Sequence, residues 1–417
     1  MGVPELSARK GVRVAMDWMT RSPLRSFVFI FLLSLAVRGY FLTKVPHQYI
    51  LPHTRWEMEA VAFSLAQRGE FADPYLLPTG ATAHLPPIMP AVLALIWTLF
   101  GMGLTAGYAA WLFRIATQAA MYGLLPWFAG KLGLGKPAGV LAGLAGALWA
   151  EWPGHGEALT AIAMGLLLVA FLRRWTMGLG TLSGSLLLGV AAGAAFHLQP
   201  ALLPLALGCM AFELWWSRHR RKWVRSAVMA LGVVLACLPW GWRNYRTFDA
   251  VFFIRSNLGL ELRMGNHEGA AAAMEVMDVR QEHRHPRTHE AEARAVQELG
   301  EVAYMRRAGR EALEWIKTHP AAFLSLTAQR VAHFWVGPLY DPLPASAVSL
   351  LTVLALVGAI RFLPVLAIPQ RAALLIPLAT YPLIYYIVAY MPRYRVPLNW
   401  IVLMFAGAEV WHWIRQR

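Results

Sequence analysis

The sequence predicts an all-α polytopic membrane protein with about ten transmembrane helices, juxtamembrane helices in its first outer loop and a small helical outer loop domain. Composition gives the first reason, because 58% of the 417 residues are hydrophobic and 15% are charged. An average soluble chain carries about 25% charged residues. The mean hydropathy of +0.46 agrees. The second reason is that long apolar segments recur along the chain, which excludes an ordinary water-soluble domain.

Ten segments have the length and hydrophobicity of a membrane-spanning helix. We predict them at residues 27–44, 107–130, 137–152, 157–172, 180–197, 200–216, 226–242, 346–363, 372–390 and 396–414. The first starts too late and runs too long for a cleaved signal peptide, so we expect a retained helix. We interpret the apolar stretch 86–100 as a helix in the membrane interface, because Pro86-Pro87 can start it and Gly101 can end it.

The net charge of +15 has two possible origins, a nucleic-acid partner or the enrichment of Lys and Arg in cytoplasmic loops. The second origin is favoured, because basic residues gather at alternate ends of the predicted spans. They are Arg9, Lys10, Arg13, Arg21, Arg25, Lys131, Lys136, Arg173, Arg174, Arg218, Arg220, Arg221, Lys222, Arg225, Arg361, Arg371, Arg415 and Arg417. We therefore predict a multi-pass protein with both termini in the cytoplasm and no nucleic-acid partner. Counting 86–100 as a further span would reverse the sides that follow it.

The predicted spans divide the chain into six segments. These are a cytoplasmic N-terminus (1–26), a first transmembrane helix (27–44), an outer loop with two juxtamembrane helices (45–106), six transmembrane helices (107–242), an outer helical loop (243–345), and three transmembrane helices with a short cytoplasmic tail (346–417). In the first outer loop, apolar residues three to four apart predict a helix at 55–69 that ends at Gly69. In the second, mixed charge at 288–318 predicts a solvated helical subdomain, closed by His319-Pro320.

Two acids, Glu57 and Glu59, stand just outside the first predicted span. Residues two apart on a helix point about 200° apart, so only one of them can face a shared cleft. Glu57 follows Trp56 and is our candidate for a catalytic carboxylate, with Glu59 as the alternative base. A pair of solvated surface acids is the other interpretation.

Two further polar side chains are candidate substrate-binding groups. His84 lies in the turn-rich loop 72–90, where a proline-stiffened backbone can present a binding residue. Glu157 lies at the outer start of the fourth predicted span, within EWPGHGEALTA. Ordinary loop or helix-end polarity is the alternative for both, and it is the interpretation that we favour for His155 and His197.

A histidine-rich stretch, HRHPRTH, contains His283, His285 and His289. Its spacing matches no zinc site and its arginines would repel a cation, so we interpret it as a solvated loop. The sequence also has no Walker A, GxGxxG, HExxH or GxSxG element in a suitable context. We therefore predict neither a metal nor a cofactor.

Several arginines lie in the outer segments, where the positive-inside tendency disfavours them. They are Arg243, Arg246, Arg255 and Arg263 after the seventh predicted span, and Arg393 and Arg395 before the tenth. A guanidinium fork matches phosphate oxygens in geometry and charge. We therefore predict an anionic partner, which is a lipid phosphate, the substrate or the membrane headgroups.

Five segments follow one another in an order that resembles a known family. They are RWEMEAVAFSLAQRGEFADP, PTGATAHLPPIMPAVLALIWTLFG, PWGWRNYRTFDAVFFIRSNLGLELRMGN, HPAAFLSLTAQRVAHFW and YPLIYYIVAYMPRYRVPL. Over nearly the whole chain they resemble bacterial GT-C glycosyltransferases, which are related to protein O-mannosyltransferases and the aminoarabinose transferase of lipid A. The resemblance implies a GT-C-like fold with two juxtamembrane helices in the first outer loop.

The resemblance also implies roles for individual residues. The acidic residue of the family's first outer loop matches Glu57, the RN and SN elements match Arg243, Asn244, Ser256 and Asn257, and the RYR element matches Arg393, Tyr394 and Arg395. His84 departs from the pattern, because relatives of this branch commonly have an aromatic residue there. We also expect no large soluble domain after the last span, where many members carry one.

The function that the resemblance implies is an inverting glycosyltransferase of the bacterial cytoplasmic (inner) membrane. It would move a hexose or pentose from a polyprenyl-phosphate carrier to a lipid, glycan or protein acceptor on the periplasmic or extracellular side, in contact with membrane lipids. Arg393 and Arg395, with Arg243 as a further candidate, would neutralise the departing phosphate. Glu57 would act as general base, or would bind the sugar if the acceptor were itself a phosphate.

A transporter or flippase of a lipid-linked anionic substrate is the alternative. Such proteins commonly carry charged residues within their spans and are built from repeated halves. The ionisable groups of this chain lie at the outer margin and no internal repeat is found, which favours the enzyme.

Overall fold

The computed structural model describes residues 3–149, 154–280 and 284–416. The first half of the chain forms α1 (Val3–Thr20), α2 (Pro23–Leu42), α3 (His47–Ile50), α4 (Glu57–Arg68), α5 (Ile88–Phe100), α6 (Leu104–Leu132), α7 (Lys136–Leu148), α8 (Glu157–Met177), α9 (Leu182–Leu198) and α10 (Leu202–Trp216). The second half forms α11 (Lys222–Phe248), α12 (Leu258–Gly265), α13 (Met274–Val279), α14 (Glu290–Leu299), α15 (Glu301–Thr318), α16 (Pro320–Val336), α17 (Pro342–Phe362), α18 (Ile368–Thr380) and α19 (Val396–Gln416). Three short 3-10 helices are η1 (Leu363–Val365), η2 (Tyr381–Tyr386) and η3 (Pro392–Arg395).

The predicted all-α membrane architecture is confirmed. A helix occupies each of the ten predicted spans, namely α2, α6 to α11 and α17 to α19. Four stretches of the described residues, α2, α8, α11 and α17 with η1, are long and apolar enough to cross a bilayer by length and composition alone. The stretch interpreted as interfacial forms α5, whose 13 residues are as few as those of α7 and α18, so its position in the membrane interface stays a prediction.

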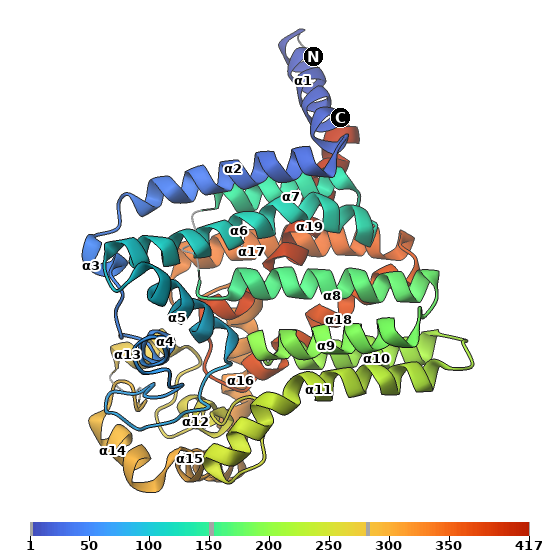
Figure 1. Ribbon diagram of the computed structural model, residues 1–417. Helices are drawn as coiled ribbons and strands as arrows, with labels where there is room; N and C mark the ends of the chain where they lie inside the picture. Colours follow the sequence, from blue (N-terminus) through green and yellow to red (C-terminus); the bar gives the residue numbers. More distant parts are fainter. Residues whose placement is uncertain (1–2, 150–153, 281–283, 417) are drawn as a thin grey trace.

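The long helices lie side by side in one bundle, and α4 and α12 to α15 gather at one end of it (Figure 1). The two long loop segments, 45–106 and 243–345, therefore meet at the same end of the molecule. They share a small hydrophobic core, in which Tyr75 of the first segment packs with Leu260 and Tyr304 of the second. The helical segment expected to be solvated thus buries one face against the first loop.

Two segments predicted to be continuous are interrupted. Residues 288–318 form α14 and α15, which are separated at Gly300, where φ is +78°, a backbone region that favours glycine. The predicted span 372–390 is α-helical only as far as Thr380 and continues as η2. Pro382 lacks the N–H that a further turn of α-helix would use, which accounts for the change.

Glycine allows two bundle helices to approach closely. Gly189 of α9 and Gly232 of α11 each face the backbone of the other helix, and a Cβ atom at either position would collide with a carbonyl oxygen. Small residues at such contacts are a common means of close packing between membrane helices.

Charged side chains inside the bundle are paired. Arg174 of α8 donates two hydrogen bonds to Glu213 of α10, at 2.9 and 2.8 Å, and Arg361 pairs with Glu409 at 2.8 Å. Arg38 of α2 donates to two carbonyl oxygens near the end of α7, at 2.9 and 3.1 Å. The expectation that ionisable groups stay at the outer margin is therefore wrong for these residues, which join one helix to another.

Candidate active site

Five polar side chains, Glu57, His84, Arg255, His285 and Arg393, gather where the two long loop segments meet the segment that precedes α19, and we refer to this cluster as the cleft. The guanidinium of Arg287, from the second loop, donates to the carbonyl oxygens of Tyr75 at 2.6 Å and Arg55 at 3.0 Å, both in the first loop. These bonds hold His285 against the N-terminus of α4. Glu57, the first residue of α4, therefore faces the side chain of His285, although the two residues are far apart in the sequence.

Glu57 presents a half-buried carboxylate to this cleft. Its Oε1 lies 3.4 Å from Nδ1 of His285. That nitrogen accepts a hydrogen bond from the backbone N–H of Arg287 at 3.0 Å, so it has no proton to donate to Glu57. Within the described residues no hydrogen bond reaches the Glu57 carboxylate. Its oxygens are available to a ligand.

His84 is buried beside Glu57. Its Nδ1 lies 3.1 Å from the hydroxyl of Tyr75, and its ring centre is 5.7 Å from that of His285. Burial, followed by the charge of Arg255 and the proximity of His285, holds the pKa of His84 well below its ordinary value. The imidazole is therefore neutral at pH 7 and keeps one nitrogen lone pair.

Glu57, His84 and His285 together could hold a metal ion. One potential ligand atom from each lies within 4.8 Å of the others, and a carboxylate with two imidazoles suits zinc and similar divalent ions. The solvated-loop interpretation is wrong for His285, because its side chain is buried. His283 lies outside the described residues, and His289 precedes α14.

Arg393 places a cation in the same cleft. It lies in η3, is exposed, and has its guanidinium 5.8 Å from the ring centre of Tyr394. Desolvation opposes its charge, but Tyr394 and the carboxylates of Glu157, Glu57 and Glu261 outweigh that effect and raise the pKa of Arg393. Among the described residues Arg393 makes no direct ion pair. Its charge is balanced at a distance, which leaves the guanidinium available to an anion.

Arg255 supplies a second cation beside the first. Its Nε donates to the carbonyl oxygen of His84 at 2.8 Å, and its Nη2 lies 3.6 Å from Oε1 of Glu261. Asn257, which is buried, donates to that same oxygen at 2.8 Å. Asn257 therefore orients Glu261, and Glu261 orients Arg255. Glu157, by contrast, accepts a hydrogen bond from the N–H of Gly156 at 3.0 Å.

Two of the predicted substrate-binding residues, Arg243 and Ser256, help to hold the loop that carries His84, and a third, Asn244, bonds to the segment after α11. Arg243 donates to the carbonyl oxygen of Thr82 at 2.7 Å. Asn244 is buried and donates to the backbone just beyond α11. Ser256 donates at 2.6 Å to Glu301, which also accepts from Thr82. The hydrogen bonds of Arg243 and Ser256 thus position this loop, and contact of Arg243, Asn244 and Ser256 with a substrate stays a prediction.

The guanidinium of Arg395 points into the protein, and the side chain is buried. It donates to Asn399 at 3.0 Å, to the carbonyl oxygen of Trp335 at 2.8 Å and to the hydroxyl of Thr352 at 2.8 Å. Arg395 thus ties α16 and α17 to α19. Its neighbour Tyr394 stacks on Tyr385, with ring centres 4.4 Å apart, beside the free cation of Arg393.

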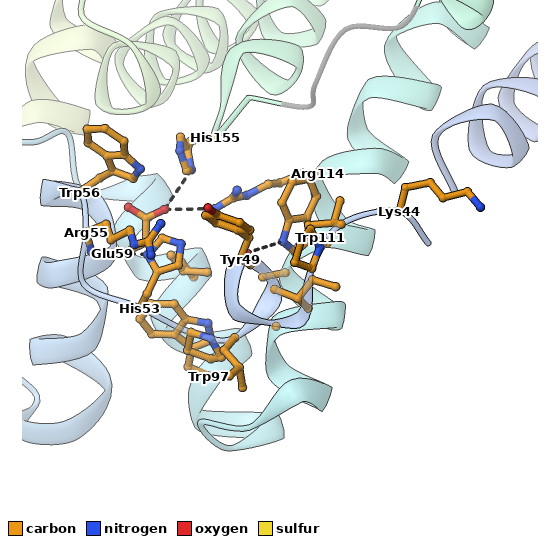
Figure 2. Close-up of a pocket in the computed structure, with 18 residues that line it drawn as sticks. Lys44, Tyr49, His53, Arg55, Trp56, Glu59, Trp97, Trp111, Arg114 and His155 are labelled. Carbon is orange, nitrogen blue, oxygen red and sulfur yellow. Dashed lines mark hydrogen bonds and ion pairs between the residues drawn. The ribbon is translucent and has the colours of Figure 1, made fainter. Parts of the chain in front are cut away.

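Glu59 faces away from this cleft, as the helical spacing predicts. Its side chain is buried, with Oε1 3.4 Å from both Arg114 and Nδ1 of His155 (Figure 2). Glu57 and Glu59 therefore serve two different spaces on either side of α4. Arg255 could be recognised from the sequence only as one of several outer arginines, and no sequence signal marked Glu261. His285 was marked by the histidine-rich stretch HRHPRTH, but that stretch was interpreted as a solvated loop.

The GT-C-like fold that the sequence predicts is confirmed by similarity to solved structures. The structure is similar to the archaeal oligosaccharyltransferase AglB from Archaeoglobus fulgidus in complex with an inhibitory peptide and a dolichol-phosphate, with a TM-score of 0.56 and 14% identity over 94% of this chain and 50% of that chain. The apo form of the Archaeoglobus fulgidus oligosaccharyltransferase gives a TM-score of 0.55 at 14% identity, over 96% and 51% of the two chains.

A third similar structure is ArnT from Cupriavidus metallidurans bound to undecaprenyl phosphate, with a TM-score of 0.39 and 14% identity over 92% of this chain and 77% of that chain. The present chain spans about half the length of the two oligosaccharyltransferase chains. No family model and no curated protein matches the sequence. The likeness at this identity shows the fold alone.

Proposed function

We propose that the protein is an inverting glycosyltransferase of the bacterial cytoplasmic membrane, which moves a sugar from a polyprenyl-phosphate carrier to an acceptor on the outer face. The observation that carries the proposal is one cleft that contains an available carboxylate, Glu57, and two cations, Arg255 and Arg393. The fold supports it, since AglB, which shares this fold, was solved with a dolichol-phosphate.

The carrier phosphate would lie against Arg255 and Arg393. Glu261 orients the guanidinium of Arg255 through an ion pair. The guanidinium of Arg393 makes no direct ion pair with a described residue. A departing phosphate is a weak base, so the reaction needs neutralisation of its charge more than protonation. Two fixed cations in a partly dry cleft supply that neutralisation without reorganisation of solvent.

The chemical step is a single displacement. The acceptor hydroxyl oxygen forms a bond to the anomeric carbon from the side opposite the phosphate, and the bond from that carbon to the phosphate oxygen breaks with its electrons leaving on the phosphate. Glu57 accepts the hydroxyl proton. One displacement inverts the anomeric configuration, so a single carboxylate is sufficient.

The alternative of a transporter finds less support in the positions of the charged groups. Arg174 and Glu213 in the bundle, like Arg361 and Glu409, are occupied with each other. The available groups of the cleft instead lie together at one end of the helices. A conducting path would need available polar groups at depth.

The two functions are separated by an assay in proteoliposomes with labelled polyprenyl-phosphate-linked hexoses and pentoses. We expect the label to move from the carrier to a second molecule, with inverted anomeric configuration in the product. Movement of intact carrier between the leaflets without any loss of its sugar would support the transporter and contradict the proposed transferase.

A further inference from the structure

A pocket of about 450 Å³ lies on the other side of α4 from Glu57. Its walls come from the chain after α2, from α3 to α6, and from the segment before α8 (Figure 2). Because α2 is long and apolar enough to cross a bilayer, and the pocket begins where α2 ends, the pocket lies at the level expected for lipid headgroups.

The inner end of this pocket holds an unsatisfied acceptor. Glu59 is 2% exposed, and its Oε2 has no hydrogen-bond partner among the described residues. Burial raises the pKa of Glu59, although the charge of Arg114 opposes the rise. A buried carboxyl oxygen without a partner is unfavourable. A ligand that brings a donor to this oxygen would remove the penalty.

An unsatisfied donor lies in the same pocket. Trp97 of α5 is buried, and its indole N–H has no hydrogen-bond partner among the described residues. Oε2 of Glu59 therefore lacks a donor, and the indole N–H of Trp97 lacks an acceptor, among the described residues. A hydroxyl group is both donor and acceptor, so hydroxyls on one ligand can satisfy both side chains.

The mouth of the pocket is positively charged. Lys44 and Arg55 are exposed there, and Arg114 lies deeper, whereas Glu59 is the single acidic residue among the described residues of the lining. Arg55 lies over the ring of Tyr49, 5.0 Å from its centre, so the cation is held at the mouth. This excess of positive charge suits a phosphate attached to the hydroxyl-bearing group.

Apolar surface continues from the pocket along α6. Leu104, Tyr108 and Leu112 are exposed on one face of that helix, because residues four apart lie above one another. This stripe neighbours Trp111, which lines the pocket. Acyl chains attached to a bound headgroup can lie along this stripe and remain in the membrane.

We propose that this pocket binds the headgroup of a lipid acceptor, a glycerol- or sugar-containing headgroup with a phosphate. The inference rests on the proposed function and narrows its acceptor from a lipid, glycan or protein to an anionic lipid. His155 lies at the inner end of the pocket, with its Nδ1 3.4 Å from Oε1 of Glu59. Trp56, which precedes Glu57 at the N-terminus of α4, also lines the pocket, so the acceptor hydroxyl would pass this end of the helix to reach the catalytic carboxylate on its other side.

The test measures lipid binding to the full chain in detergent by native mass spectrometry. The probe is phosphatidylglycerol. The comparators are phosphatidic acid, which lacks the headgroup glycerol and its hydroxyls, and phosphatidylcholine, which has no net charge. We expect phosphatidylglycerol to bind about fivefold or more tightly than either. Equal affinity for all three would overturn the proposal.

Two variants assign the binding to this pocket. Trp97→Phe removes the indole N–H together with part of the ring system but keeps an aromatic side chain, and it should weaken phosphatidylglycerol binding about three- to tenfold without changing phosphatidic acid binding. Lys44→Gln combined with Arg55→Gln should weaken both about tenfold. The matched control is Lys317→Gln, an exposed lysine near the end of α15, which should change neither. Unchanged binding in the first two variants would overturn the proposal.

Failure of the pocket is distinguishable from failure of the proposed transfer, because the binding assay contains no sugar donor. Phosphatidylglycerol binding that depends on Trp97 without any sugar transfer would refute the transferase and leave the lipid site. Transfer that depends on Glu57, with an unchanged KM for lipid acceptors in Trp97→Phe, would refute the acceptor pocket alone. Displacement of phosphatidylglycerol by a polyprenyl phosphate, or equal binding of soluble glycerol 1-phosphate, would also overturn it.

Discussion

Arg393 and Arg395 are close in sequence, yet loss of charge should affect them in opposite ways. Arg393 is exposed in the cleft and has no direct ion pair among the described residues. Arg395 is 3% exposed, and its donors are used by Asn399, Trp335 and Thr352. The first should contribute to carrier binding and the second to the stability of the bundle.

The expected magnitudes follow from these contacts. A hydrogen bond to a charged group contributes about 1.5–3 kcal/mol, so Arg393→Gln should weaken binding of a polyprenyl phosphate about ten- to hundredfold. Its effect on the free energy of unfolding should stay within about 0.5 kcal/mol. Arg395→Gln leaves buried acceptors without donors at about 1–3 kcal/mol each, so its melting temperature should fall by several degrees.

Binding of a fluorescent polyprenyl phosphate and thermal unfolding, both in the same detergent, measure the two effects side by side. Arg371→Gln, at the cytoplasmic end predicted for α18, is a control for a general loss of positive charge in the binding measurement. Normal carrier affinity in Arg393→Gln would refute the phosphate contact. A fully stable Arg395→Gln that binds carrier poorly would show that the two roles are assigned the wrong way round.

Three further predictions concern protonation, metal and buried charge. Folding lowers the pKa of His84, so the unfolded chain binds a proton at this residue at a higher pH than the folded chain does. The free energy of unfolding should therefore fall as pH drops below about 6.5. His84→Phe should show a smaller fall in melting temperature than the wild type between about pH 7 and about pH 5, and an equal fall would contradict this prediction. We expect sugar transfer to survive EDTA, because Arg255 and Arg393 neutralise the phosphate; activity lost to EDTA and restored by zinc would instead assign Glu57, His84 and His285 to a metal. Glu213→Gln leaves Arg174 buried without its charged partner and should destabilise the protein by about 3–5 kcal/mol. Adding Arg174→Met to this variant should recover stability, as measured by thermal unfolding. An unchanged stability of Glu213→Gln would count against a buried ion pair.

Hydrophobicity was sufficient to predict the helices, because a span must be apolar over a length set by the bilayer. Local signals were also sufficient for α4 and α5, whose ends at Gly69 and Gly101 carry positive φ angles. The break after Thr380 was missed, since proline is tolerated within many membrane helices. Helical spacing correctly separated the directions of Glu57 and Glu59.

The sequence was less informative about the side chains that meet in the cleft. The predicted topology marked Arg393 and Arg395 as unusual, because it places them at an outer end, but it could not show that only one of them faces the cleft. The guanidinium of Arg395 donates its hydrogen bonds to carbonyl and hydroxyl oxygens of α16 and α17, and no local sequence pattern reveals these contacts. His285 reaches Glu57 only because Arg287 joins the two loops.

The central claim is that Glu57 takes the proton of the acceptor. The most direct measurement is the single-turnover rate of sugar transfer by Glu57→Gln, taken together with its affinity for the carrier. The control is Glu314→Gln, an exposed acid on α15. We expect Glu57→Gln to transfer about a hundred- to ten-thousandfold more slowly with unchanged carrier affinity, whereas the control transfers at the wild-type rate. Transfer by Glu57→Gln at the wild-type rate would contradict the claim.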